Sequence, residues 1–147
     1  MSKSTFVYVT YIRSTPDQVF KALTDKEITR LYWGHNNVSD WKPGSKWEHR
    51  RSSNGNVDIL GEVIEAKPPS RLVISWASPE NPNALSRVTF DIEAASELVK
   101  LTVTHDDLEA GSGMDKGIRS GWPLVLSSLK TYLETGKAID VMAMKRA

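Results

Sequence analysis

The sequence predicts an α+β fold in which a curved antiparallel sheet of about six to seven strands wraps around a long C-terminal helix. Strand-like segments joined by turn residues fill the middle of the chain, two short helical segments follow the first strand, and the last helix has one apolar stripe. At 3.6 residues per turn the stripe spans about 120°. Its members are Ile118, Trp122, Val125, Leu126, Leu129, Tyr132 and Leu133.

The first strand and the two short helices are indicated by composition and by capping residues. The segment 6–12 is rich in β-branched and aromatic residues, which favours a strand. Thr15 to Gln18 combine an N-cap threonine, a proline suited to the first helical position and a glutamine that completes a capping box. A second helix is expected to begin after Asp25 and to end at Gly34.

The pair Asn54-Gly55 predicts a two-residue type I′ hairpin. That turn would place Arg51 opposite Asp58, a favourable cross-strand match, and Trp47 opposite Glu62. Which face of the 47–52 strand points inward stays open at this point. The competing apolar face of the partner strand consists of Val57, Ile59, Gly61 and Val63.

A second hairpin follows the strand Leu72 to Trp76. With a four-residue loop at Ala94 to Glu97, six apolar side chains fall on one face of the sheet and polar ones on the other. The expected pairs are Ile92 with Val99, Phe90 with Leu101, and Val88 with Val103.

The last helix is expected to begin between Met114 and Ile118 and to end at Gly136. Pro123 lies inside this segment, so the sequence predicts either a kink or a start near Gly121. The tail from 137 to 147 is expected to be loosely held.

Composition narrows the classes of function. The length of 147 residues predicts one domain over residues 1–147, with an ordered core at about 5–136. The net charge of +1 argues against nucleic-acid binding, and the lack of cysteine excludes a disulfide framework or a thiolate site. The N-terminal segment lacks an apolar signal core, and no stretch approaches the roughly 20 apolar residues of a membrane span. We therefore expect a cytoplasmic protein without membrane insertion.

Several motifs, in this order and spacing, carry a resemblance to a known family. They are Thr15-Pro16-x-x-Val19-Phe20, Tyr32-Trp33-Gly34, Trp41-x-Pro43-Gly44-Ser45-x-Trp47-Glu48, Gly61-x-Val63-x-Glu65-x-x-Pro68-Pro69-x-Arg71-Leu72, and Gly121-Trp122. Together they resemble homologues of the C-terminal domain of the heat shock protein 90 ATPase activator, within the START-like (SRPBCC) superfamily. The resemblance implies a helix-grip fold, as in the birch pollen allergen, with a cavity between the final helix and the sheet. It also implies an apolar ligand, while the chain is too short to include the activator's chaperone-gripping N-terminal domain.

A ligand site is expected where the aromatic side chains of the sheet meet the final helix. Core packing is the competing interpretation of the same residues. His105 continues an apolar strand face, from which an imidazole can bond either a ligand or the backbone. The candidate ligand-binding residues are Trp33, His35, Trp47, Trp76, Phe90, His105, Trp122 and Leu126.

No catalytic, metal or cofactor site is expected. His35, His49 and His105 show no metal-ligand spacing. Glu62 is the best candidate for a general acid or base, with a solvated strand carboxylate as the alternative. Serine nucleophile and phosphate-loop motifs are absent from the sequence.

Three hypotheses for the function follow. The first is a non-catalytic module, monomeric or homodimeric, that binds a small hydrophobic or amphipathic molecule. The second is a chaperone-related or stress-related module that binds a protein partner. The third is a cyclase-like or hydrolase-like enzyme with an acid or base in the cavity.

Overall fold

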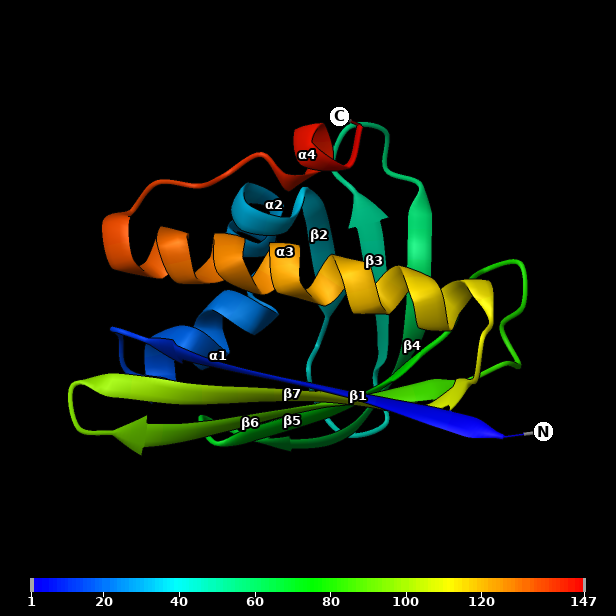
Figure 1. Cartoon of the computed structure of the whole chain (residues 1–147), viewed down its shortest axis with the longest axis horizontal. Helices are drawn as coiled ribbons and strands as arrows, with labels where there is room; N and C mark the ends of the chain where they lie inside the picture. The colour runs from blue at the N-terminus through cyan, green and yellow to red at the C-terminus, as the bar shows by residue number, and fades with distance from the viewer. Residues whose placement is uncertain (1, 147) are drawn as a thin grey trace.

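A computed structural model describes residues 2–146 of the protein, with side chains up to residue 144. The elements in chain order are β1 (Lys3–Ile12), α1 (Pro16–Thr24), α2 (Lys26–Trp33), β2 (His35–Ser39), β3 (Lys46–Arg51), β4 (Val57–Lys67), β5 (Arg71–Trp76), β6 (Ser86–Ala95), β7 (Leu98–Glu109), α3 (Gly113–Thr135) and α4 (Val141–Arg146). The seven strands form one antiparallel sheet in the order β1-β7-β6-β5-β4-β3-β2. The predicted helix-grip architecture, with two short helices after the first strand, is confirmed (Figure 1).

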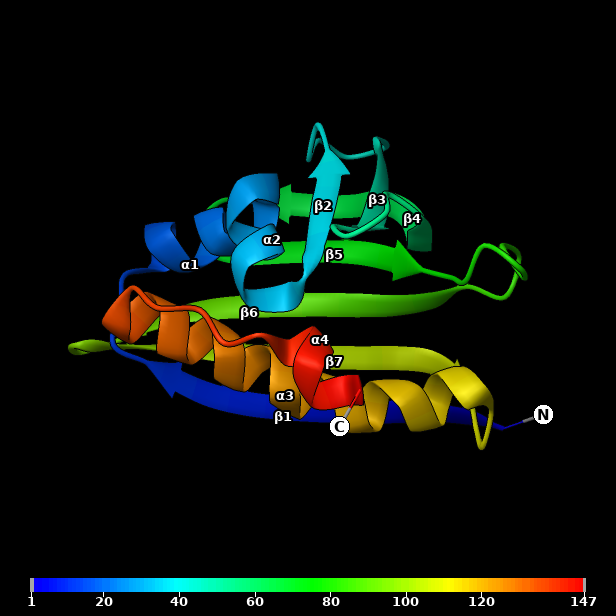
Figure 2. The same ribbon diagram turned by 90° about the horizontal axis from the view of Figure 1, so that it is seen from above.

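Helix α3 lies along the concave side of the bent sheet and packs against β1, β7 and α2 (Figures 1 and 2). Its apolar stripe faces inward as predicted. Ile118, Trp122, Val125, Leu126 and Leu129 are buried, while Tyr132 and Leu133 pack partly buried at the edge of the core. Burial of one long apolar stripe therefore holds α3 against the β1 and β7 end of the sheet.

The capping residues define α1 and α2 as expected. The Thr15 hydroxyl accepts a hydrogen bond from the Gln18 amide at 3.3 Å, and the Asp25 carboxylate accepts bonds from the first amides of α2. Gly34 ends α2 at φ 74°, and a Cβ there would lie 2.5 Å from Cγ of Met142. This glycine therefore lets α4 approach the end of α2.

The predicted register of the β3–β4 hairpin is wrong by one residue. Trp47 pairs with Gly61 rather than Glu62, because the connection runs from Arg51 to Asn56 and a bulge follows His49. A slip of one residue changes which side chains share a face. The observed register places Trp47, His49 and Gly61 on one face and leaves Glu62 exposed. The face of β3 that carries Trp47 and His49 is therefore the inward one.

The β6–β7 register also differs from the prediction, here by two residues. The turn holds only Ser96 and Glu97, so that Phe90 pairs with Val103 and Val88 with His105. Because side chains alternate with a period of two, this slip keeps the predicted apolar face intact.

The C-terminal part departs from the prediction in two ways. Helix α3 begins at Gly113 with Ser112 as N-cap, one residue before the expected range of Met114 to Ile118, and ends before Gly136 as predicted. It includes Pro123, so the alternative of a start near Gly121 is wrong. The tail is not loosely held throughout, because Val141 is buried and the Ser128 hydroxyl lies 2.8 Å from the Tyr32 carbonyl and 3.3 Å from that of Ile139. These contacts hold α4 against α2 and α3.

None of the helices in residues 2–146 combines the length and apolar character of a membrane crossing.

Candidate ligand-binding cavity

A cavity of about 360 Å³ lies between α3 and the inner face of the sheet. Side chains from α2, from four strands and from both C-terminal helices line it. They are Trp33, His35, His49, Arg51, Asp58, Ile59, Trp76, Gly113, Met114, Gly117, Ile118, Gly121, Trp122, Val125 and Met142. A larger hollow of about 830 Å³ lies at the surface beside α1, α2, β2 and β3, but it is lined mainly by polar and charged side chains, of which Glu48 and Arg50 already pair with each other.

Glycines open the α3 side of the cavity. Gly113, Gly117 and Gly121 follow one another at one-turn spacing and all line the space. A Cβ at any of the three would meet no neighbouring atom within 4 Å. The cavity therefore depends on missing side chains in a helix that is otherwise well packed.

Indole rings form the apolar wall. Trp122 lies 5.5 Å from Trp33 and 5.4 Å from Trp76, measured between ring centroids, with interplanar angles of 58° and 45°. Trp47 packs behind Trp76 at 5.5 Å and donates its indole N–H to the Ser75 carbonyl. Tilted aromatic pairs at these separations stabilise one another by about 0.5–1.5 kcal/mol beyond the area that they bury.

A chain of three hydrogen bonds runs from the Trp122 ring to the backbone of Trp76. The indole N–H of Trp122 donates to Nδ1 of His105 at 3.1 Å, so Nδ1 has no proton. Nε2 of His105 then carries the proton and donates it at 2.8 Å to the hydroxyl of Ser86, which itself donates to the Trp76 carbonyl. His105 is thus held neutral, and burial lowers its pKa to about 4, against smaller raising effects of Asp106 and Asp115.

Two histidines lie at the other end of the cavity. The rings of His35 on β2 and His49 on β3 stack face to face, with centroids 3.8 Å apart and planes 5° from parallel. Trp33 meets His49 edge-on at 4.7 Å. The sequence indicated three unrelated histidines because the polar segment before Ser39 did not predict a strand. Pairing of β2 with β3 is what brings these two together.

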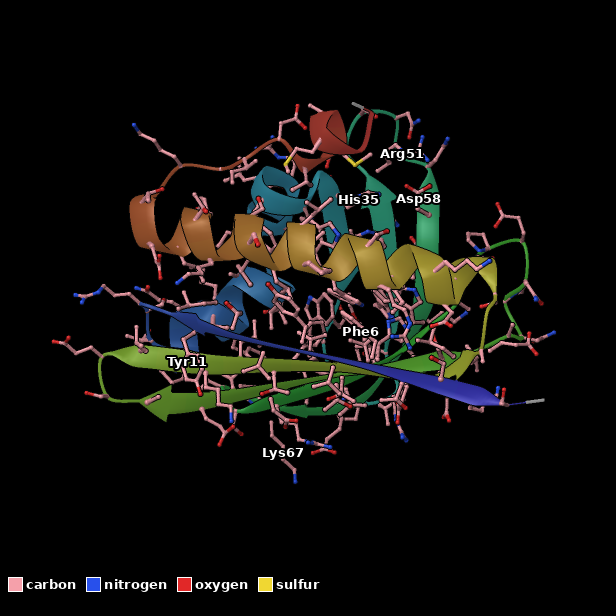
Figure 3. All side chains as sticks on the ribbon, in the orientation of Figure 1. Phe6, Tyr11, His35, Arg51, Asp58 and Lys67 are labelled. Carbon is pink, nitrogen blue, oxygen red and sulfur yellow. The ribbon has the colours of Figure 1, made fainter. Side chains whose placement is uncertain are left out.

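His35 belongs to a charged group with Asp58 and Arg51 (Figure 3). Nε2 of His35 lies 2.8 Å from Oδ2 of Asp58, and Arg51 donates to both oxygens of Asp58, from Nε at 3.0 Å and from Nη2 at 2.8 Å. Burial alone would raise the pKa of Asp58, but the hydrogen bonds from Arg51 and His35 outweigh it, so the pKa lies below its ordinary value. Within the described residues, no group of three or more acidic, histidine or cysteine side chains is arranged to hold a metal ion.

Four of the eight residues expected at a ligand site line this cavity, namely Trp33, His35, Trp76 and Trp122. The other four, Trp47, Phe90, His105 and Leu126, are buried behind the lining. Sequence reasoning missed His49, Arg51, Asp58, Met142 and the three glycines. Of these, only the match between Arg51 and Asp58 could be recognised in the sequence, and the ion pair does form although the predicted register does not.

Comparison with solved structures agrees with this architecture. The Aha1 dimer from Colwellia psychrerythraea has a TM-score of 0.78 and 21% identity, covering 92% of this chain and 99% of that chain. An HSP90 activator from Plasmodium falciparum has a TM-score of 0.75 and 28% identity, covering 88% and 95%. CalU16 from Micromonospora echinospora has a TM-score of 0.74 and 21% identity, covering 95% and 80%.

The comparison with curated proteins gave no match. Residues 13–134, however, match the family described as Activator of Hsp90 ATPase homolog 1-like protein. This match spans most of the chain, from the end of β1 to the last turn of α3. The resemblance found in the sequence is therefore confirmed, and the chain belongs to the family of Activator of Hsp90 ATPase homolog 1-like proteins.

Proposed function

We propose that the protein binds a small amphipathic molecule in the cavity between α3 and the sheet and does not catalyse a reaction on it. The observation that carries this proposal is a cavity of about 360 Å³ walled by indole rings at one end and by His35, Asp58 and Arg51 at the other. Small-molecule sites generally fall in the range of about 300–1,000 Å³ and combine an apolar wall with a few polar groups.

Apolar burial supplies the driving force. Enclosing about 200 Å² of apolar ligand surface would contribute about 5 kcal/mol before the costs of ordering are subtracted. The rings of Trp76 and Trp122 are already held by packing and, for Trp122, by His105, so little side-chain freedom is lost on binding.

The hydrogen bonds of the site favour binding over acid–base chemistry. Both ring nitrogens of His105 are engaged within the protein, and both oxygens of Asp58 accept bonds from Arg51 or His35. A general base needs a free lone pair within reach of the substrate proton. His105 offers none, and the pKa of Asp58, held below its ordinary value by Arg51 and His35, makes that carboxylate a weak base.

The neutral fluorophore N-phenyl-1-naphthylamine tests the proposal. We expect its emission to rise on titration with the protein and the rise to saturate at one molecule per chain. Gly117→Leu would fill the cavity from α3 and abolish the rise, whereas Ser120→Leu, an equally small-to-large change at an exposed α3 position outside the lining, would preserve it. Equal binding by the two variants, or no binding by the unaltered protein, would refute the proposal.

The family match favours a second candidate, an interaction with an Hsp90 chaperone in the cytoplasm. The outer face of the edge strand β1 exposes Val7, Val9 and Tyr11, which give a partner an apolar row to contact. Stimulation of Hsp90 ATPase turnover by the protein, lost on Val9→Asp but kept in the cavity variant Gly117→Leu, would support this candidate. Unchanged turnover with the unaltered protein would dismiss it.

A further inference from the structure

The Asp58 carboxylate at the cavity's polar end is already paired within the protein. Oδ1 of Asp58 accepts from Nη2 of Arg51 at 2.8 Å. Oδ2 accepts from Nε of Arg51 at 3.0 Å and lies 2.8 Å from Nε2 of His35. A ligand ammonium group would therefore share this carboxylate with Arg51 and would lie against the like charge of its guanidinium, which repels it.

Donors, in contrast, remain available at the same end. Arg51 uses Nε and Nη2 on Asp58, and its Nη1 amino group has no partner among the described residues. The indole N–H of Trp33, a residue that lines the cavity, likewise makes no hydrogen bond among them, and its nitrogen is not fully buried. Donors of lining residues that lack a protein partner favour a ligand that brings an acceptor.

Both ring nitrogens of His35 lie against oxygen atoms of the protein. Nδ1 lies 3.2 Å from the Trp33 carbonyl and Nε2 lies 2.8 Å from the Asp58 carboxylate. Carbonyl and carboxylate oxygens only accept, so both ring nitrogens of His35 face acceptors of the protein. His35 therefore offers no acceptor to a ligand, and Arg51 is the group at this end that can meet one.

These residues form one continuous run of contacts with the aromatic wall. His35 bonds the Trp33 carbonyl and stacks on His49, and His49 meets the Trp33 ring edge-on. Trp33 in turn packs on Trp122. A planar ring against the indoles would thus place a substituent at the group of Arg51, Asp58 and His35.

Resting on the proposed function, we infer that the ligand is an aromatic anion, such as an aryl carboxylate, whose ring packs on Trp33, Trp76 and Trp122. Its charged end accepts hydrogen bonds from Nη1 of Arg51 and from the indole N–H of Trp33. Arg51 and Asp58 form a bidentate pair, so the guanidinium is already oriented when the anion arrives.

Three probes that share one ring system test the inference: 2-naphthoate, 2-naphthalenemethanol and 2-naphthylmethylammonium. Calorimetric titration of the whole chain at neutral pH is expected to give an affinity for the naphthoate at least about tenfold above that for the alcohol, with the ammonium weakest. Equal or tighter binding of the alcohol or the ammonium would overturn the inference and leave the proposed function standing. Binding of none of the three would overturn the proposed function itself.

A charge-neutral double variant and a neighbouring single variant locate the anion. Replacing Arg51→Gln together with Asp58→Asn keeps the net charge and is expected to reduce naphthoate affinity to that of the alcohol without changing alcohol affinity. Arg50→Gln, one residue away and outside the cavity lining, should leave both affinities unchanged. Naphthoate binding that survives the double substitution would exclude Arg51 as the anchor, and if the double variant fails to fold, the three-probe series with the unaltered protein decides.

Discussion

Lowering the pH is expected to destabilise the protein through His105. This side chain is completely buried and neutral, with Nδ1 accepting from Trp122 and Nε2 donating to Ser86. Protonation would place a second donor against the indole N–H of Trp122 and would bury a charge. Burial accordingly lowers the pKa from 6.5 to about 4.

The size of this loss of folding stability follows from the difference between the pKa of His105 in the unfolded chain and its pKa in the folded chain. The unfolded chain takes up this proton near its ordinary pKa of 6.5, while the folded chain takes it up only near pKa 4. Stability from His105 is therefore complete above pH 7 and is lost as the pH falls through the window between the two values. The loss reaches about 2 kcal/mol at pH 5 and about 3 kcal/mol at pH 4.

Urea unfolding measured from pH 8 to pH 4 checks this expectation against a matched variant. His105→Gln can still accept from Trp122 and donate to Ser86 but does not titrate in this range. We expect the difference in unfolding free energy between the two proteins to change by about 2 kcal/mol between pH 8 and pH 5, because the carboxylates and the other histidines are common to both. If the difference in unfolding free energy between the two proteins stays constant to within about 0.5 kcal/mol from pH 8 to pH 5, the assignment of His105 as a buried neutral donor and acceptor is refuted.

Three further changes give distinct outcomes. Gly61→Ala would place a Cβ 2.0 Å from the Ser75 carbonyl and 2.7 Å from Nε1 of Trp47, so urea unfolding should show a loss of about 2–3 kcal/mol, and a neutral effect would contradict the close approach of β4 to β5. Gly117→Ala meets no atom within 4 Å and removes a flexible helix residue, so thermal unfolding should show a gain of about 0.5–1 kcal/mol, while a loss would mean that α3 is not a regular helix there. Ser128→Ala removes hydrogen bonds to Tyr32 and Ile139 and should cost about 1–2 kcal/mol with faster hydrogen exchange in α4, whereas unchanged exchange would show that Val141 alone holds the tail.

The fold was predictable from the sequence because its strongest determinants are local. The caps at Thr15 and Asp25 and the stripe on α3 need only neighbouring residues to be recognised. The β3 register was not predictable, because Asn54-Gly55 lies inside a connection longer than a two-residue turn and a bulge after His49 shifts the pairing.

The cavity was only half predictable for a related reason. Aromatic residues such as Trp76 and Trp122 stand out in the sequence as candidates, but packing alone decides which of them line a space and which fill the core. The space itself comes from Gly117 and its neighbouring glycines, and from the approach of Met142, a residue of a tail without any periodic pattern. The polar end depends on β2, where buried polar side chains concealed the strand.

The hydrogen-bonded chain from Trp122 through His105 and Ser86 to the backbone of Trp76 limits how this protein can diversify. Each member holds the next, so replacing Trp122 leaves the buried imidazole of His105 without its partner. Relatives that acquire different ligands are expected to keep this wall and to vary the glycine positions and the charged end, where a single substitution changes shape or charge without loosening the core. Selectivity in such a protein can then change while its folding stability stays nearly constant.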